Sequence, residues 1–299
     1  MRPTALLTAL FGLATACGCS ATSATSTFDE GASGQGGAGG TGAGSGGAQG
    51  GTGGDPGGIA VDAGSDGDAP KPLVAQVFAH SKDTLYRLDP DTKAAARVAE
   101  FQGCSSVIDL AIDKDGVMFG TTFDVLWRID PKTAACTQVA TGAYPNSLSF
   151  VPKGTLDAAK EALVGYVGSD YVRIDEVSGS VTTVGSLGGG DYQSSGDLVS
   201  VIGGGTYLTV KGGDCADCIV RVDPKSGAME SMIGHLDHSS VFGLAFWGGV
   251  AYGFDDAGTL FQIDLATGAT QGIAMPGAPD GLSFWGAGST TAAPLVTPK

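Results

Sequence analysis

A short motif that recurs five times constrains the fold of this chain more than any other feature. Its clearest copy is Trp127-Arg128-Ile129-Asp130-Pro131, and related segments end at Asp89, Asp175, Asp223 and Asp264. The five aspartates are 41, 45, 48 and 41 residues apart. A period of about 40 to 50 residues is typical of a four-stranded propeller blade, whereas the common helical repeats recur near 33 or 34 residues. The spacing therefore predicts an all-β chain built of blades.

One complete unit shows the strands that such a blade needs. The segment 108–112 is followed by β-type segments at 117–121, 126–130 and 137–140, each separated from the next by turn residues. Short apolar runs bounded by Gly, Pro, Asp and Asn are typical of antiparallel strands. The third strand carries apolar residues on both faces, as expected when each blade packs between two others.

The ring is expected to close through the end of the chain. An inner-strand motif begins at Asp109, Ser147, Asp197, Gly243 and Gly281, and no further strands follow the last copy. Conversely, the first third-strand segment, at 85–89, has a second-strand candidate but no inner strand before it. We therefore expect residues 281–285 to add the inner strand of the N-terminal blade, which gives five closed blades and leaves no open sheet edge. A six-bladed ring, with a degenerate blade within 185–209 or the C-terminal tail, remains an alternative.

The Asp-Pro-x-Thr/Ser-Gly sequence after the third strand predicts a turn. Its Asp accepts local backbone hydrogen bonds, Pro presets the next φ, and Gly179, Gly227 or Gly268 can take the left-handed position. The copies at Lys93 and Ala134 have no glycine there. For these two copies we expect different turns.

The first 70 residues predict export and tethering. Residues 1–19 combine Arg2 with an apolar run too short to span a bilayer, which is typical of a signal peptide. The run ends in a lipobox-like sequence at Cys17, with Cys19 as the alternative lipidation site, and the absence of Asp after either cysteine resembles outer-membrane sorting. Plain secretion is the other interpretation. The segment that follows, 20–70, is rich in glycine: between residues 31 and 58, 16 of 28 residues are Gly. This composition predicts a disordered linker.

Residues 71–287 are expected to form the propeller, and 288–299 a flexible tail. The whole chain has a formal net charge of −15, and from Lys71 onward it has 25 acidic and 15 basic residues. Acidic surfaces repel phosphate backbones, so we expect no nucleic-acid partner. Membrane contact is expected only through the N-terminal lipid, and the propeller is expected to be a monomer.

Four cysteines lie in the predicted propeller. Cys215 and Cys218 are expected to form a local disulfide in a hairpin, since an exported protein favours disulfides. A redox role would need a helix N-terminus, and a single Cys-x-x-Cys is a weak zinc motif. Cys104 and Cys136 are expected at opposite rims of the ring, which disfavours their pairing, and we leave that pairing open.

Propellers place ligands at the rim where the inner strands begin. We expect polar side chains to gather at this rim and to form a binding site. The alternative is that they are ordinary solvated surface residues. They are Asp109, Asn146, Ser147, Asp191, Tyr192, Asp197, His235, Asp237, His238 and Asp280. Oxygen ligands of this kind suit Ca²⁺, but no ligand loop of fixed spacing supports it. No nucleophile elbow, zinc helix, Walker loop or dinucleotide fingerprint is present, so no catalytic residue is assigned.

At the Arg-Ile-Asp-Pro and Asp-Leu-Ala-Ile repeats the sequence resembles exported bacterial β-propeller lipoproteins that carry a Gly-rich tether. The resemblance covers roughly 73–285 and implies the fold but no single role. The chain is also distantly similar to the propeller lactonases, which hold a Ca²⁺ with Glu, Asn and Asp. Asp109, Asn146, Asp197 and Asp280 compare with that set, but the glutamate is missing.

These observations favour a binding module over an enzyme. The leading hypothesis is a lipid-anchored propeller of the outer membrane, at the periplasmic or cell-surface face, that binds a protein or a small molecule without a cofactor. The first alternative is a metal-dependent lactonase or hydrolase. The second is a structural protein of the envelope.

Overall fold

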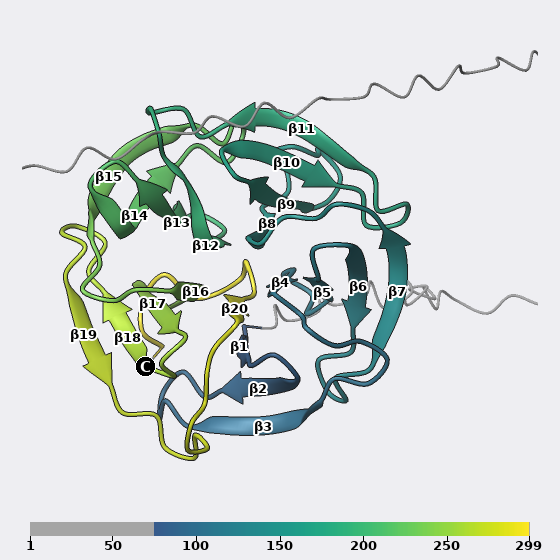
Figure 1. The fold of residues 1–299 in the computed structure, drawn as a ribbon, viewed down its shortest axis with the longest axis vertical. Helices are drawn as coiled ribbons and strands as arrows, with labels where there is room; N and C mark the ends of the chain where they lie inside the picture. The colour runs from purple at the N-terminus through teal and green to yellow at the C-terminus, as the bar shows by residue number, and fades with distance from the viewer. Residues whose placement is uncertain (1–74, 299) are drawn as a thin grey trace, which may run out of the picture. The chain divides into compact units, whose positions relative to one another are not determined.

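The computed structural model describes residues 75–298, which form five four-stranded antiparallel sheets around a central axis (Figure 1). Within these residues there is no helix of the length and hydropathy needed to cross a membrane. The predicted five-bladed propeller is confirmed, and the six-bladed alternative is wrong. The predicted signal peptide 1–19, the lipidation sites Cys17 and Cys19, and the linker 20–70 lie outside the described residues.

Each blade contributes one strand to the axis and three strands outside it. Blade 1 contains, from the axis outward, β20 (Gly286–Ser289), β1 (Val77–His80), β2 (Thr84–Leu88) and β3 (Ala95–Glu100). Blade 2 contains β4 (Asp109–Ile112), β5 (Met118–Thr121), β6 (Val125–Ile129) and β7 (Cys136–Thr141). Blade 3 contains β8 (Leu148–Val151), β9 (Ala162–Val167), β10 (Asp170–Ile174) and β11 (Val181–Ser186).

The last two blades follow the same order. Blade 4 contains β12 (Gln193–Ser200), β13 (Thr206–Gly212), β14 (Cys215–Val222) and β15 (Met229–His235). Blade 5 contains β16 (Val241–Trp247), β17 (Val250–Asp255), β18 (Leu260–Ile263) and β19 (Thr270–Ile273). Buried side chains from facing sheets form the core between blades, and the largest of them include Tyr166, Tyr171, Phe254 and Phe261.

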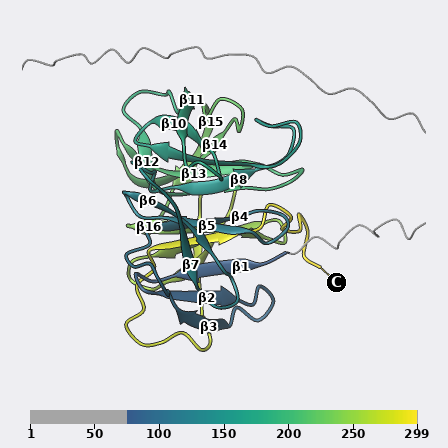
Figure 2. The ribbon, with the colours of Figure 1, turned by 90° about the vertical axis from the view of Figure 1, so that its right-hand side faces the viewer.

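We call the rim at which the inner strands begin the mouth, and the rim that carries the repeated Asp-Pro turns the turn rim. Figure 2, turned by 90° from Figure 1, shows the strands lying between these two rims. Because β1 pairs with β20 antiparallel, Val77 lies opposite Ser289 at the turn rim and His80 lies opposite Gly286 at the mouth. The chain therefore enters blade 1 at the turn rim.

The inner strand of blade 1 is not the segment that the repeat predicted. We expected residues 281–285, but the strand is Gly286–Ser289, which pairs with β1. The reason is room at the axis, because a Cβ at Gly286 would overlap Nε2 of His80 and one at Gly288 would lie 3.0 Å from Cδ1 of Leu110. Larger residues such as Phe284 pack instead between blades 5 and 1.

The folded part of the chain also extends beyond residue 287, where the flexible tail was expected to begin. Ser289 is the last residue of β20, and Thr290 and Thr291 after it are buried. The hydroxyl of Thr291 donates a hydrogen bond of 2.7 Å to the buried side chain of Glu161. Ala293 packs into the core cluster that includes Val201. The tail boundary at 288 is therefore wrong for these residues.

Blade twist explains a disulfide that the sequence disfavoured. Cys104 and Cys136 are bonded, with Cα atoms 5.7 Å apart, although we expected opposite rims. Twist accumulates across each sheet, so the outermost strands β3, β7, β11, β15 and β19 run around the circumference (Figure 1). The end of β3 therefore reaches the start of β7, and the backbone N–H of Cys136 donates to the carbonyl of Gln102 at 2.8 Å.

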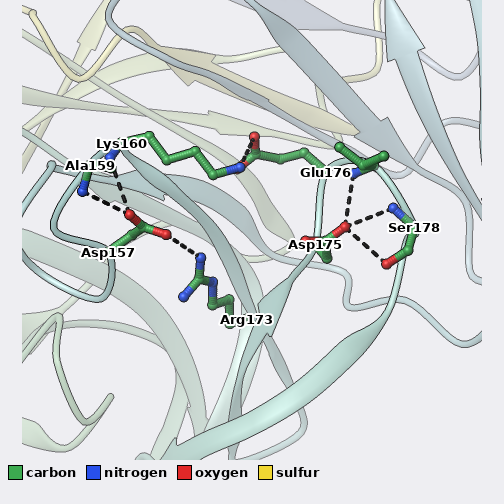
Figure 3. A network of polar contacts seen from close by, with 8 residues as sticks. Asp157, Ala159, Lys160, Arg173, Asp175, Glu176 and Ser178 are labelled. Atoms are coloured by element: carbon green, nitrogen blue, oxygen red, sulfur yellow. Dashed lines mark hydrogen bonds and ion pairs between the residues drawn. The ribbon is translucent and has the colours of Figure 1, made fainter. Parts of the chain in front are cut away.

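The repeated aspartate ends the third strand and holds the turn that follows. In blade 3, Oδ1 of Asp175 accepts hydrogen bonds from the backbone N–H groups of Val177 at 3.1 Å and Ser178 at 2.7 Å (Figure 3). Arg173 of the same repeat does not pair with Asp175. Its guanidinium donates instead to Oδ2 of Asp157, at 2.7 Å. The motif is therefore structural and belongs to the turn rim.

All five copies of the turn have one geometry. In each, a residue with positive φ donates its backbone N–H to the carbonyl of the repeat Asp, as predicted for Gly179, Gly227 and Gly268, whose φ values are 70°, 71° and 77°. The expectation of different turns elsewhere is wrong, because Lys93 and Ala134 take the same position with φ of 61° and 56°. The backbone hydrogen bond outweighs a left-handed cost of about 1 kcal/mol.

We expect Gly227→Ala to lower the free energy of unfolding by about 2 to 4 kcal/mol. A Cβ at Gly227 would overlap Cβ and Cγ of the buried Tyr171 in the neighbouring blade, and the residue has positive φ. Left-handed strain and overpacking therefore add. Urea unfolding measures the loss. The matched control is Gly272→Ala, where a Cβ would meet no atom within 4 Å. Equal stability of the two variants would contradict the prediction.

Candidate functional site

A cavity of about 210 Å³ opens at the mouth, on the axis of the ring. It is lined by one residue in or just before the inner strand of each blade and by Phe123 of the β5–β6 turn. The lining residues are Ile108, Phe123, Asn146, Gly196, Phe242 and Trp285. All five blades therefore build this one site, and its wall is mostly apolar.

The blade repeat explains how these residues meet. Ile108 and Trp285 directly precede β4 and β20, and Asn146 lies two residues before β8. Gly196 lies within β12, and Phe242 is the second residue of β16. Equivalent positions of equivalent strands converge at the axis. Phe123 reaches the same place from a turn and is 68% exposed.

Two fully buried carboxyl groups lie one residue further along the inner strands. Asp109 accepts hydrogen bonds from the backbone N–H groups of Leu110 at 2.7 Å and Leu148 at 2.6 Å. Asp197 accepts from Leu198 at 2.5 Å and from Leu244 and Ala287. These donors belong to β4, β8, β12, β16 and β20. The pair therefore links the inner strands of all five blades.

The side chains of Asp109 and Asp197 also form a hydrogen bond with each other. Burial raises the pKa of both Asp109 and Asp197 well above the ordinary range of an aspartate. The pKa of Asp109 is raised further by the charge of Asp197 and by the hydrogen bond between them. Burial therefore favours the protonated, uncharged form of this pair.

His80 lies beside this pair and is neutral. Its ring is fully buried, and burial lowers its pKa to about 4. Nδ1 is 2.9 Å from the carbonyl oxygen of Ser81, and Nε2 has no hydrogen-bond partner among the described residues. An atom added to Gly286 would touch both this nitrogen and Oδ1 of Asp109. The imidazole therefore adds no positive charge beside the carboxyl pair.

The carboxyl pair does not fit a Ca²⁺ site of the lactonase kind. Every carboxyl oxygen of Asp109 and Asp197 already accepts a backbone N–H. Burial raises the pKa of both groups, whereas a hard cation needs ionised oxygen ligands. Asn146 lies two residues before β8 and lines the cavity. Asp280, the fourth residue compared with that set, lies in a separate groove with Lys82.

The structure therefore brings together Asp109, Asn146 and Asp197 from the predicted rim set, and it disperses the others. Ser147 is buried and its hydroxyl accepts the backbone N–H of Tyr166 at 2.9 Å. Asp191 is exposed, and Tyr192 packs against the core between blades 3 and 4. None of these lines the cavity.

The two predicted histidines have separate local roles. His238 stacks on Phe261, with ring centroids 3.7 Å apart, and its Nδ1 lies 2.9 Å from Oδ2 of Asp255. His235 lies beside Cys218, with Nδ1 3.4 Å from Sγ. Asp237 is exposed on the connection between them.

The Cys215–Cys218 disulfide that the sequence predicted is present, with Cα atoms 5.9 Å apart. The two sulfurs and a ring nitrogen of His235 lie within 4.8 Å of one another, which is a spacing that suits a metal. The sulfurs are bonded to each other, however, so only the imidazole nitrogen is a free ligand.

Sequence reasoning missed the apolar lining because it searched the rim for polar side chains. A signal existed for Ile108 and Phe242, which directly precede the inner-strand motifs at Asp109 and Gly243. Trp285 could not be found in this way, because the motif placed it inside the wrong segment. Phe123 belongs to a turn without a repeat signature.

The comparisons support the fold and leave the role open. Residues 163–293 match a family described as a repeat of unknown function (DUF6923). No curated protein sequence matches the chain. A solved chain of a nidogen/laminin complex is similar at a TM-score of 0.50 and 11% identity, over 72% of this chain and 98% of that one.

Two other solved structures match this chain with lower TM-scores. A PQQ-bound aldose sugar dehydrogenase from Streptomyces coelicolor matches at a TM-score of 0.41 and 16% identity, over 66% of this chain and 78% of that one. A protein of unknown function from Bacteroides caccae matches at 0.40 and 10% identity, over 72% and 98%.

Proposed function

We propose that this protein is an extracytoplasmic binding module that takes the apolar part of a small ligand into the cavity at its mouth. The observation that carries the proposal is the convergence of all five inner strands on one apolar cavity. Mostly apolar pockets with a few polar groups are the usual form of small-molecule sites. Asn146 is the polar side chain of this lining, and it can orient a ligand.

The size of the cavity selects the ligand. An engineered cavity of about 150 Å³ binds benzene, whereas drug-sized ligands occupy roughly 300 to 1,000 Å³. At about 210 Å³ the cavity suits one aromatic ring or a compact branched group. A larger ligand would leave its remainder outside, next to the exposed Phe123.

The two disulfides support an oxidising, extracytoplasmic compartment, because cytosolic thiols are kept reduced. We propose anchoring in the outer membrane through a lipid on Cys17, or on Cys19, with residues 20–70 as the tether. Mass spectrometry of the mature protein tests this, since a diacylglyceryl cysteine at the new N-terminus is expected. An unmodified N-terminus would indicate plain secretion instead.

Binding accounts for the site better than hydrolysis does. Of the six lining residues none is a nucleophile or a base, and the carboxyl groups below them are fully buried and occupied by backbone donors. A lactonase would need an accessible metal or base near its substrate. We therefore propose no reaction.

Ring-sized molecules are expected to bind and to change the fluorescence of Trp285. Toluene, benzylamine and benzoate cover the three charge classes, and we expect Ile108→Trp, which fills the cavity, to weaken the binding of any that bind by roughly ten-fold or more. The matched control is Val177→Trp, at an 84% exposed position on the turn rim. Failure of all three to bind, or binding that Ile108→Trp leaves unchanged, would contradict the proposed function.

A further inference from the structure

The cavity lining is rich in aromatic side chains and carries no formal charge. Three of its six residues are Phe123, Phe242 and Trp285, from blades 2, 5 and 1. Aromatic faces attract cations that have shed their water, with about 0.5 to 2 kcal/mol per contact. The same rings provide no ligand for an anion or for a strongly hydrated metal ion.

The connections that surround the mouth are almost free of positive charge. They contain one lysine, Lys82, against seven exposed aspartates, which are Asp83, Asp124, Asp191, Asp214, Asp237, Asp256 and Asp280. Strand residues next to these connections add Glu100, Asp170 and Lys211. The connections of the turn rim have a similar net charge, but there six lysines are interspersed among eleven acidic residues, whereas the mouth has the single lysine Lys82.

Two buried carboxyl groups lie next to the cavity. Asp109 and Asp197 follow the lining residues Ile108 and Gly196 in the chain, and both are fully buried. The neutral His80 beside them adds no positive charge. The groups next to the cavity therefore include no cation that would repel a cationic ligand.

We propose that the ligand of this cavity is an organic ammonium ion whose nitrogen carries apolar substituents, such as a trimethylammonium group. This inference rests on the proposed function and adds the charge of the ligand to it. An alkylated ammonium is weakly hydrated and compact enough for a cavity of about 210 Å³. The rings of Phe242 and Trp285 contact the methyl groups, while the exposed aspartates around the mouth balance the charge.

The decisive comparison uses choline and its uncharged carbon isostere, 3,3-dimethylbutan-1-ol. The two have the same shape, so the cavity alone cannot tell them apart. We expect choline to bind about 3- to 30-fold more tightly, as measured by titration of Trp fluorescence or proton NMR shifts. Added NaCl is expected to weaken choline binding only. Equal affinity, or tighter binding of the alcohol, would overturn the inference.

Aromatic substitution separates cation recognition from simple cavity filling. We expect Phe242→Leu to weaken choline binding by roughly 3-fold or more and to change binding of the alcohol less than about 2-fold. Thermal unfolding confirms that the variant is folded, and Trp285→Leu, followed by NMR, repeats the test from blade 1. Parallel losses for both ligands in both variants would contradict a role for the rings.

The outcomes also distinguish this inference from the proposed function. If toluene and the alcohol bind but choline does not, the cavity is a binding site and its ligand is uncharged. If none of the probes binds, both proposals fail. Phosphatidylcholine vesicles carry the same head group, and co-sedimentation with them would overturn the assignment to a free cation.

Discussion

Replacement of Asp197 by alanine is expected to lower the free energy of unfolding by about 3 to 5 kcal/mol, the largest effect of any single substitution proposed for this protein. The variant removes the acceptor of three buried backbone N–H groups, those of Leu198, Leu244 and Ala287. Each donor left without a partner costs about 1 to 3 kcal/mol. Because those donors lie in blades 4, 5 and 1, the loss loosens three blades together.

Denaturant unfolding of the whole propeller measures this loss. Asp280→Ala is the matched control, because Asp280 is an exposed aspartate at the same rim. We expect the control to change stability by less than about 0.5 kcal/mol. A loss below about 1 kcal/mol in Asp197→Ala would show that the pair does not hold the inner strands together.

The second large effect is a loss of stability as the pH rises. Because the pKa of Asp109 is raised in the folded protein, the folded state binds a proton that the unfolded chain has released above about pH 4. The stabilisation is complete below that pH and declines by about 1.4 kcal/mol per pH unit until Asp109 ionises in the folded state. The proton bound by the carboxyl pair thus stabilises the folded propeller.

Asp109→Asn isolates this contribution. An amide can donate to Asp197 in place of the carboxyl proton, and it does not titrate. The turn aspartates Asp89, Asp175 and Asp223 have lowered pKa values because backbone N–H groups bond to them, so they contribute the opposite pH dependence in both proteins. The difference in unfolding free energy between the two proteins is therefore measured from pH 4 to 9. A difference that does not change with pH would contradict the assignment.

The architecture could be predicted from the sequence because its signal is periodic. The five repeated aspartates predicted the number of blades, and the Asp-Pro turns predicted the position of one rim. As expected, the side chain of the repeat Asp accepts backbone hydrogen bonds from the turn that follows it. A turn needs only local chemistry, which lies within a few residues of Asp175 or Gly227. The sequence predicted the wrong turn at Lys93 and Ala134. These residues adopt the same left-handed turn geometry as glycine does in the other copies, because the same backbone hydrogen bond forms.

The site could be predicted only in part because it depends on contacts between blades. Asp109 and Asp197 were identified as residues of the inner strands, but 88 residues of sequence separate them, and nothing local indicates that they touch. The inner strand at 286–289 has almost no side chains to form a pattern, since crowding at the axis admits Gly and Ala. The Cys104–Cys136 bond follows from the cumulative twist of a sheet, which a strand-by-strand interpretation omits.

The closure of blade 1 by both ends of the chain fixes how this protein can be oriented on a support. Gln76 bonds to Thr290, so the chain enters the propeller beside the end of its last inner strand, at the turn rim. A sensor chip, fluorophore or fusion partner attached just before residue 75 therefore starts from the rim opposite the cavity. When the protein is attached in this way, the mouth of the cavity faces the surrounding solution. A cation can then reach the cavity without passing the point of attachment.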